Sequence, residues 1–334
     1  MTTSLASAAS DCGFTGNHAL VTGGAGFIGS HLVDALVQAN TVTVLDDRSS
    51  GSLSNVHPQV RFVEGDIRER ETVAAILEDV DVVFHQAGQV SVEASIENPV
   101  ESQSVNVGGT IELLDCARQA DVRVVAASSA AVYGHPSSVP VRESARLRPT
   151  SPYGVDKLAL DQYTRRFAEL YGLPTVALRY FNVYGPRQSA TSYSGVISTF
   201  LEQARRGDPL TVHGEGTQTR DFIHVSDVVR ANIRAATTRY TGEAFNIGTG
   251  SKTSIDELAD RIRQLVTADS DIVHVDGRRG DIEHSCAETE KAKTLLDFEP
   301  RVGLTEGLET LLPVGWTDKS TRSGQSDGSK SRTT

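Results

Sequence analysis

A tyrosine and a lysine four residues apart, Tyr153 and Lys157, have the side-chain types and the spacing for proton transfer. On a helix, residues at positions i and i+4 lie on one face about one turn apart, so the two side chains would be neighbours. A nearby ammonium favours the phenolate, which would let the tyrosine exchange a proton below its free pKa of roughly 10. With the hydroxyls of Ser128 and Ser129, the pair predicts acid–base chemistry on an alcohol group of a substrate.

A glycine-rich loop, residues 23–29, is typical of dinucleotide binding. It follows an apolar run and precedes a helical pattern that begins at Phe27, and glycines there let the backbone approach a pyrophosphate at the helix N-terminus. Asp46 lies about 20 residues further on, where a carboxylate binds the adenosine ribose hydroxyls and repels a 2′-phosphate; Asp47 is a rival for this role. The loop therefore predicts NAD, whose nicotinamide would accept a hydride from the alcohol carbon.

Strand-like and helical segments alternate along the first 186 residues, which predicts an α/β fold with a Rossmann-type, doubly wound parallel sheet. We expect strands at 18–22, 42–45, 60–66, 81–85, 122–127 and 175–179. We expect helices at 27–37, 72–77, 109–119 and 152–171. After residue 186 the alternation blurs, although residues 196–206 are helical in pattern. These later segments predict a smaller C-terminal α/β substrate lobe at the carboxyl ends of the strands.

The predicted domain organisation has four parts. Ser, Ala and Thr are frequent in residues 1–16, which we expect to form a flexible extension, and residues 313–334 read as a disordered tail. The sheet domain and the lobe lie between them and exchange segments. We assign 17–186, with 221–250 returning to it, to the NAD-binding Rossmann domain and 187–220 with 251–312 to the substrate lobe.

The composition excludes several classes of protein. The net charge of −11 argues against a nucleic-acid partner, whose binding protein would be basic. The 334 residues contain no apolar run of roughly 18, and the first residues do not resemble a secretory signal, so no membrane association is expected. The cysteines, Cys12, Cys116 and Cys286, are odd in number and widely separated, which favours reduced thiols in a cytoplasm and no metal site.

These motifs together resemble the extended short-chain dehydrogenase/reductase family, and within it the NAD-dependent nucleotide-sugar epimerases of the UDP-glucose 4-epimerase group. The resemblance runs from about residue 17 to residue 312. It rests on TGGxGFIG at 22–29, SSAAVYG at 128–134, the Tyr153–Lys157 pair, RYFNVYGP at 179–186 and RDFIHV at 220–225.

The resemblance implies a role for individual residues. Catalysis would fall to Ser129, Tyr153 and Lys157. The cofactor would contact Gly23, Gly26, Phe27, Ile28, Gly29, Asp46, Asp66 and Ile67, together with Tyr153 and Lys157. The nucleotide sugar would contact Ser129, Tyr153, Asn182, Arg220, Arg278, Asp281 and Ser285. Asn106 would support the site, and His85 is assigned no role.

Members of this group share the oxidation of sugar C4 and differ in the step that follows. Dehydratases and decarboxylases place acidic residues after the catalytic serine or threonine, where this chain has Ala130 and Ala131. The resemblance therefore implies a UDP-sugar 4-epimerase acting on UDP-glucose/UDP-galactose and, because Ser285 is small, on UDP-GlcNAc/UDP-GalNAc as well. It also implies a homodimer formed through helices 109–119 and 152–171.

The sequence leaves two alternative functions open. The first is another nucleotide-sugar-modifying member of the family, such as a uronic acid epimerase, a dehydratase or a reductase. The second is a non-catalytic regulator that binds NAD or a nucleotide sugar on the same fold, because a fold does not by itself determine a function.

Overall fold

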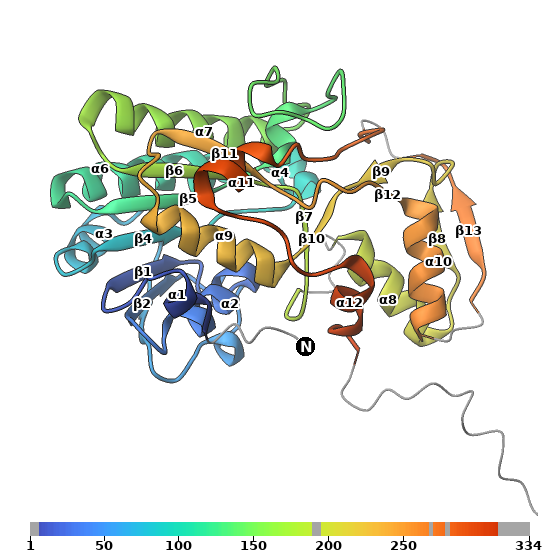
Figure 1. Ribbon diagram of the computed structural model, residues 1–334, viewed down its shortest axis with the longest axis horizontal. Helices are drawn as coiled ribbons and strands as arrows, with labels where there is room; N and C mark the ends of the chain where they lie inside the picture. Colours follow the sequence, from blue (N-terminus) through green and yellow to red (C-terminus); the bar gives the residue numbers. More distant parts are fainter. Residues whose placement is uncertain (1–6, 189–194, 267–269, 278–280, 313–334) are drawn as a thin grey trace, which may run out of the picture.

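A seven-stranded sheet, parallel at every pairing, forms the centre of the molecule (Figure 1). The computed structural model describes residues 7–188, 195–266, 270–277 and 281–312. The strands lie in the order β11-β6-β5-β4-β1-β2-β3. Their bounds are β1 His18–Thr22, β2 Thr41–Asp46, β3 Arg61–Glu64, β4 Val82–His85, β5 Arg123–Ser129, β6 Thr175–Tyr180 and β11 Glu243–Ile247.

Helices cover both faces of this sheet because its strands carry apolar side chains on both sides. On β1, Ala19 and Val21 belong to one hydrophobic cluster, whereas Leu20 belongs to the opposite one. The first cluster is closed by α2 (Phe27–Leu36) and α9 (Val225–Thr237). The second is closed by α3 (Arg70–Leu77), α6 (Thr110–Ala120) and α7 (Pro152–Tyr171). The strands and helices expected in this part of the chain are confirmed, with shifts of a few residues at their ends.

The order of the strands reverses beside β1. The chain runs outward from β1 through β2 to β3 and then crosses to β4 on the other side of β1. Ligands of such sheets bind outside the carboxyl ends of the strands at this reversal. Three short elements follow β4 there, namely α4 (Val92–Glu97), α5 (Pro99–Gln103) and the π-helical turn η3 (Ser104–Gly109).

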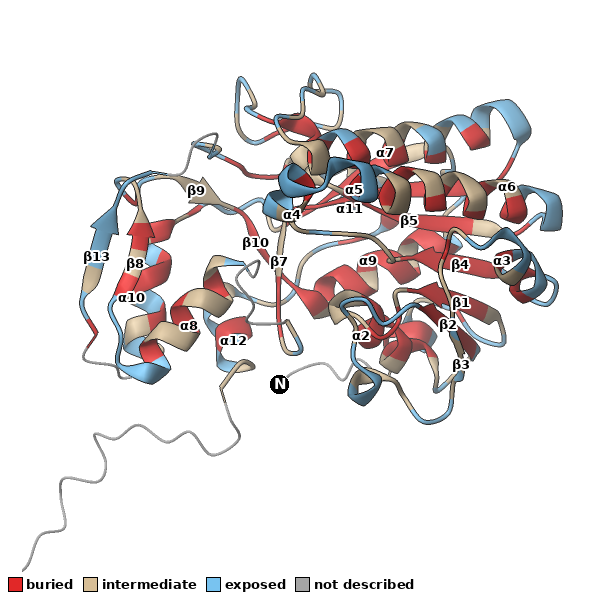
Figure 2. Ribbon diagram, turned by 180° about the vertical axis from the view of Figure 1, so that it is seen from behind, coloured by how far each residue is buried: buried red, intermediate tan, exposed pale blue. Residues whose placement is uncertain are grey.

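A smaller lobe with its own hydrophobic core lies beside the sheet (Figures 1 and 2). It contains α8 (Val196–Arg206), α10 (Ile255–Val266), α12 (Leu304–Glu309) and the paired strands β8 (Leu210–His213) and β13 (Ile272–Val275). Two further pairs join the lobe to the sheet domain: β7 (Asn182–Tyr184) with β10 (Phe222–His224), and β9 (Thr219–Arg220) with β12 (Thr253–Ser254).

One part of the predicted lobe packs on the sheet domain instead. The helix α11 (Glu290–Leu296) lies against β11 and α9. Its Ala292 and Leu296 are one turn apart, and with Phe298 they are buried in the cluster that α2 and α9 close. The predicted boundary of 251–312 missed this because one short apolar face does not reveal which core it covers.

The N-terminal segment is folded from residue 7 onward, where the sequence predicted a flexible extension over residues 1–16. The helix α1 (Ala8–Asp11) packs against α2 and α9, and Ala8, Ala9 and Phe14 are buried. The Phe14 ring meets Phe84 of β4 edge-on, with 5.8 Å between ring centroids. The small side chains of this segment let the short helix pack closely. The prediction failed because a segment rich in Ser, Ala and Thr is also typical of a linker. The predicted tail, residues 313–334, lies outside the described residues.

Among the described residues, no helix has the length and apolar content needed to cross a lipid bilayer.

Candidate functional site

The glycine loop joins β1 to α2 at the point where the strand order reverses. Gly23 has φ +69°, and a β-carbon there would lie 2.7 Å from the backbone nitrogen of Ala87. A β-carbon at Gly29 would overlap the carbonyl oxygen of Gly23. The helix begins after Gly26 without a side-chain cap, which leaves its first N–H groups open to an anion, beside the predicted contacts Phe27 and Ile28. The loop therefore fits the pyrophosphate of a dinucleotide.

Of the two rival acids after β2, Asp46 is the one that touches this loop. Its carboxylate accepts hydrogen bonds from the backbone N–H groups of Ala25 (2.9 Å) and Arg48 (2.8 Å) and is buried. The Asp47 carboxylate is exposed and bonds the N–H and hydroxyl of Ser49. The position of Asp46 suits a residue that would bind the adenosine ribose.

Asp66 and Ile67 follow β3 at the same edge of the sheet. Ile67 is buried against Gly109, where a β-carbon would lie 2.6 Å from its side chain. Arg68, which the sequence analysis did not single out, donates to the Asp66 carboxylate at 2.6 Å and reaches Glu101 at 3.0 Å. This hydrogen bonding holds the pKa of Asp66 below its usual value. Nothing in the sequence pattern distinguishes Arg68 from other surface arginines.

Ser129, Tyr153 and Lys157 come together at the carboxyl end of β5 and the first turns of α7. Ser129 ends β5, and its side chain forms a hydrogen bond with the Tyr153 phenol. The Lys157 Nζ donates to the carbonyl oxygen of Ala127 at 2.9 Å and lies 6.0 Å from the centroid of the Tyr153 ring. The i, i+4 spacing thus places phenol and ammonium on one helix face, as the sequence predicts.

Burial shifts the pKa values of Tyr153 and Lys157 in the directions that favour the neutral form of each side chain. Burial raises the pKa of Tyr153, and the hydrogen bond with Ser129 only partly offsets this. The sequence predicts that Lys157 lowers the pKa of Tyr153. This prediction is wrong for the net shift, because the pKa of Tyr153 is raised. Burial also lowers the pKa of Lys157 to about 8, against an opposing effect of Asp156. In low-dielectric surroundings the charged form of either group is penalised.

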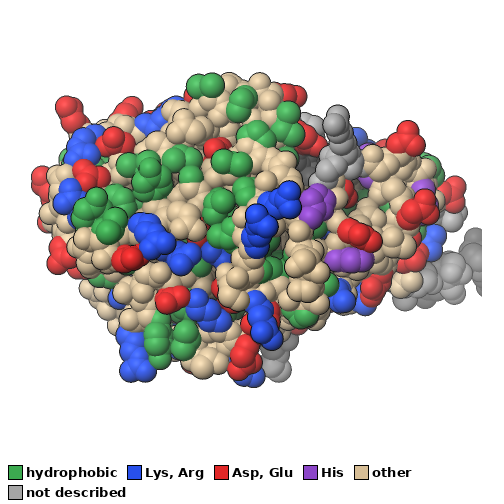
Figure 3. Space-filling model, turned by 90° about the horizontal axis from the view of Figure 1, so that it is seen from above, with side chains coloured by type: hydrophobic (Ala, Val, Ile, Leu, Met, Phe, Trp, Pro, Cys, Tyr) green, Lys and Arg blue, Asp and Glu red, His purple; other side chains and the backbone are tan. Residues whose placement is uncertain are grey.

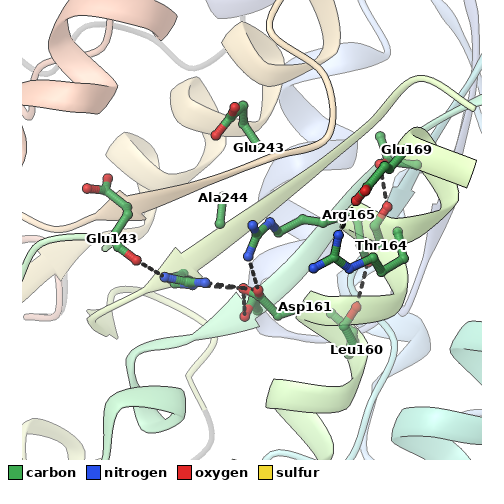
Figure 4. Close-up of polar contacts among 12 residues, drawn as sticks. Glu143, Leu160, Asp161, Thr164, Arg165, Glu169, Glu243 and Ala244 are labelled. Carbon is green, nitrogen blue, oxygen red and sulfur yellow. Dashed lines mark hydrogen bonds and ion pairs between the residues drawn. The ribbon is translucent and has the colours of Figure 1, made fainter. Parts of the chain in front are cut away.

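A buried ion pair fixes α7 to the sheet behind this group. Asp161 of α7 accepts two hydrogen bonds from Arg179 of β6, at 2.8 and 2.9 Å, and another from the Ser128 hydroxyl at 3.1 Å. Arg179 also donates to the Tyr133 hydroxyl at 2.9 Å. Figure 4 shows Asp161 together with Arg165, a second and more distant arginine of α7 whose guanidinium lies 3.7 Å from the Asp161 carboxylate. Ser128, the neighbour of Ser129, is thereby held in place.

The predicted sugar-nucleotide residues gather where the lobe joins the sheet domain. Arg220 of β9 forms an ion pair with Asp281 and is largely buried. Ser285 is buried, and its N–H donates to the carbonyl oxygen of Thr219 at 3.1 Å. The Asn182 side chain bonds the carbonyl oxygen of Asp221 at 3.2 Å. Arg278 lies outside the described residues.

Asp221 is a structural anchor that the sequence analysis missed. Its fully buried carboxylate accepts hydrogen bonds from the N–H groups of Thr249, Gly250 and Ala287 at 2.8 to 3.0 Å, and from the Thr249 hydroxyl. It therefore ties the segment of Arg220 to the turn after β11 and to the chain after Ser285. Among the described residues, no group of three or more His, Cys, Asp or Glu side chains is arranged to hold a metal ion.

A parallel sheet with a glycine loop at its reversal point and a Ser–Tyr–Lys group at the carboxyl end of β5 defines a dinucleotide-binding α/β protein of Rossmann type. The model of the NAD dependent epimerase/dehydratase family matches residues 19–248, and the chain belongs to this family of enzymes.

The similarity to known relatives and to solved structures extends over nearly the whole chain. The chain is 40% identical over 307 residues to a putative UDP-glucose 4-epimerase of Methanocaldococcus jannaschii, covering 91% of this chain and 99% of that protein. The structure of Thermotoga maritima UDP-glucose 4-epimerase with UDP-glucose has a TM-score of 0.85 at 38% identity, covering 88% and 96% of the two chains. The structure of UDP-N-acetylglucosamine 4-epimerase of Methanobrevibacter ruminantium with UDP-N-acetylmuramic acid has a TM-score of 0.86 at 36% identity, covering 89% and 97%.

The glycine loop gives a first prediction. We expect Gly29→Ala to weaken NAD binding at least about tenfold, because the new methyl group displaces the Gly23 carbonyl and with it the surface that faces the pyrophosphate. The measurement is the NAD content of the purified protein, followed by titration of the stripped protein with NAD. Gly303→Ala is the matched control, since a β-carbon there meets nothing within 4 Å. Equal NAD binding in both variants would contradict the assignment of the loop.

Proposed function

We propose that this protein is an NAD-dependent UDP-sugar 4-epimerase that interconverts UDP-glucose and UDP-galactose through a transient 4-keto sugar. The proposal rests above all on the convergence of Ser129, Tyr153 and Lys157 at the end of β5. Only β4 lies between β5 and β1, the strand that leads into the glycine loop. The relatives described above are named for this class of reaction.

Each residue of the group has one task in the proposed mechanism. Tyr153, as the phenolate, takes the proton of the C4 hydroxyl, and the Ser129 hydroxyl orients the reacting oxygen and stabilises its developing charge. Lys157 stabilises the phenolate through its positive charge. NAD, when bound, supplies the acceptor and later the donor of the C4 hydride. Arg220, with Arg278 as the second predicted arginine, holds the diphosphate while the keto sugar presents its other face.

The residues after Ser129 favour epimerisation over elimination or decarboxylation. Ala130 and Ala131 begin the 3₁₀ turn η4 (Ala130–Tyr133), and Ser129 Oγ accepts from the Ala131 N–H at 3.1 Å. Methyl side chains at these positions can neither donate nor accept a proton. A uronic acid epimerase or a reductase remains the alternative within the family, and a non-catalytic regulator makes no use of the Ser–Tyr–Lys group.

The Tyr153 phenol gives the test of this proposal. Proton NMR of the protein with UDP-galactose, without added NAD, should show UDP-glucose appearing. We expect Tyr153→Phe to lower turnover by about 10² to 10⁴, because the acid–base group is lost, while nucleotide binding is kept. Tyr163→Phe removes a hydroxyl from the same helix at a side chain that is 42% exposed and should leave turnover unchanged. Normal turnover in Tyr153→Phe would refute the mechanism, and consumption of added NADH in proportion to product would indicate a reductase.

We further propose that the protein accepts UDP-GlcNAc and UDP-GalNAc. Ser285 is small and buried beside the β9 strand that carries Arg220. The resemblance to the nucleotide-sugar epimerases implies that the residue at this position limits the 2-substituent of the sugar. A bulky side chain at this position would exclude an N-acetyl group.

We expect Ser285→Tyr to lose activity on UDP-GlcNAc at least about tenfold more than activity on UDP-galactose, since one misfitting group in a pocket changes discrimination by about 10- to 200-fold. Ser285→Ala is the control and should retain both activities. The comparison uses kcat/KM for the two substrates, and an equal loss for both in Ser285→Tyr would refute the role of this residue.

We also propose that the protein forms a homodimer. Large exposed apolar side chains lie on α4, α5 and α7, among them Ile96 (61% exposed), Val100 (76%), Val155 and Tyr163. Figure 3 shows hydrophobic side chains gathered on one face of the molecule. The family resemblance implies α6 and α7 as the pairing helices, but α6 carries none of the large exposed apolar side chains, whereas α4 and α5 do. Exposed apolar side chains on helices that pack side by side, as α4, α5 and α7 do, support an interface at this surface.

The double variant Ile96→Glu/Val100→Glu should be monomeric, because burying two carboxylates in an apolar interface is strongly unfavourable. Light scattering after size exclusion gives the mass. Val275→Glu, on the exposed strand β13 of the lobe, is the control and should remain a dimer. A dimer in both variants would place the interface elsewhere.

A cytoplasmic location is part of the proposal, supported by three free cysteines, Cys12, Cys116 and Cys286, which persist as thiols under reducing conditions.

A further inference from the structure

Asp156, the residue before Lys157, is a buried carboxylate whose partner is a neutral hydroxyl. It is 5% exposed, and its Oδ2 accepts a hydrogen bond of 2.6 Å from Ser102 of α5, which is itself fully buried. Among the described residues, no ion pair involves Asp156. A buried carboxylate is unfavourable unless a nearby positive charge offsets the loss of hydration, so the surroundings of Asp156 should contain a cation that benefits from it.

Lys157, the next residue along α7, is the cation on which the negative charge of Asp156 acts. This side chain is 4% exposed, and burial lowers its pKa to about 8, while the negative charge of Asp156 opposes that decrease. Without Asp156 the pKa of Lys157 would therefore fall toward neutral pH. A lysine that has lost its proton can no longer stabilise the Tyr153 phenolate.

The other titratable groups around Lys157 do not supply a negative charge in its place. His85 of β4 is fully buried, and burial lowers its pKa to about 3, so it is neutral. Burial raises the pKa of Tyr153, which disfavours its phenolate. Asp161, one turn further along α7, is engaged by Arg179. From β5, Lys157 receives the Ala127 carbonyl, a dipole without net charge.

A chain of hydrogen bonds fixes the position of the Asp156 carboxylate. Asn106, in the π-helical turn η3, donates to the Ser102 hydroxyl at 3.4 Å and exchanges hydrogen bonds with the backbone of Gln89 at 2.9 and 3.0 Å. At Gly88, between these groups and Lys157, a β-carbon would lie 2.7 Å from Asn106 Oδ1 and 3.5 Å from Lys157 Nζ. The loop after β4, the turn η3 and Lys157 are therefore packed against one another.

We propose that Asp156 is a positioning residue for the proton chemistry at Tyr153: its buried carboxylate, held by Ser102, keeps Lys157 in the ammonium form at the pH at which the enzyme works. The inference rests on the proposed function for the task of Lys157. The charge of Lys157 itself is measurable without turnover, so the two proposals fail separately.

The charge of Asp156 affects the pH range over which Lys157 keeps its proton. Lys157 is charged below its pKa and neutral above it. Removing the charge of Asp156 lowers the pKa of Lys157, so the ammonium is lost at a lower pH. Activity that depends on the ammonium then ends at a lower pH, and the alkaline limb of the pH–activity curve moves in the acid direction.

The direct test is the titration of Lys157 by NMR in protein labelled with ¹³Cε-lysine. The chain has only six lysines, and the signal of Lys157 is identified by its absence in Lys157→Arg. In Asp156→Asn we expect its midpoint to fall by about one pH unit, a tenfold loss of proton affinity. Glu169→Gln removes the same charge from the exposed end of α7 and should leave the midpoint unchanged. An unchanged midpoint in folded Asp156→Asn would overturn the proposal.

The pH dependence of kcat/KM separates positioning from a merely structural role. In Asp156→Asn the alkaline limb should move by the same amount as the NMR midpoint, with activity recovering toward the wild-type value at lower pH. A loss that is equal at every pH would show a structural role and refute the proposal. Should Asp156→Asn fail to fold, Ser102→Ala keeps the charge of Asp156 and removes the hydroxyl that holds it. We then expect a smaller shift of the Lys157 midpoint in the same direction. An unchanged midpoint in folded Ser102→Ala would count against the proposal. A shifted Lys157 midpoint in a protein without epimerase activity would support this inference and refute the proposed function.

Discussion

The buried ion pair between Asp161 and Arg179 is the interaction on which the arrangement of the site depends. It joins α7, which carries Tyr153 and Lys157, to β6, and through Ser128 it also holds the end of β5. Both side chains are almost fully buried, and Nη1 of Arg179 donates to the Tyr133 hydroxyl and to the Glu143 carbonyl. Removing one partner of such a pair leaves an uncompensated charge and costs about 3–5 kcal/mol, so the helix and the two strands act as one rigid unit.

Burial at the end of β5 works against the charged forms that the proposed chemistry requires. It raises the pKa of Tyr153 and lowers that of Lys157, so an isolated pair would remain neutral. Two neighbours act in the opposite direction: the hydrogen bond with Ser129 favours the phenolate, and the charge of Asp156 favours the ammonium. The site therefore combines exclusion of water with partial compensation by neighbouring groups, and perturbed pKa values of this kind are typical of functional sites.

The second half of the site is assembled from segments that are distant in the chain. The carboxylate of Asp221 connects the strand of Arg220 with Thr249, Gly250 and Ala287, and the Arg220–Asp281 ion pair closes the same region. The two lobes meet here, next to the carboxyl ends of the central strands (Figure 1). The proposed mechanism requires the nucleotide sugar to bind at this junction.

The sequence by itself determined the features that depend on local period and spacing. The strands of the sheet, the glycine loop and the common face of Tyr153 and Lys157 follow from patterns within a few residues, and the structure agrees with these patterns. Only the tertiary structure decided that the N-terminal segment with Phe14 is packed and that α11 belongs to the sheet domain. It also decided the partners of Arg68 and Asp221 and the upward shift of the Tyr153 pKa. Burial and pairing depend on which distant segments meet, and no local pattern records that.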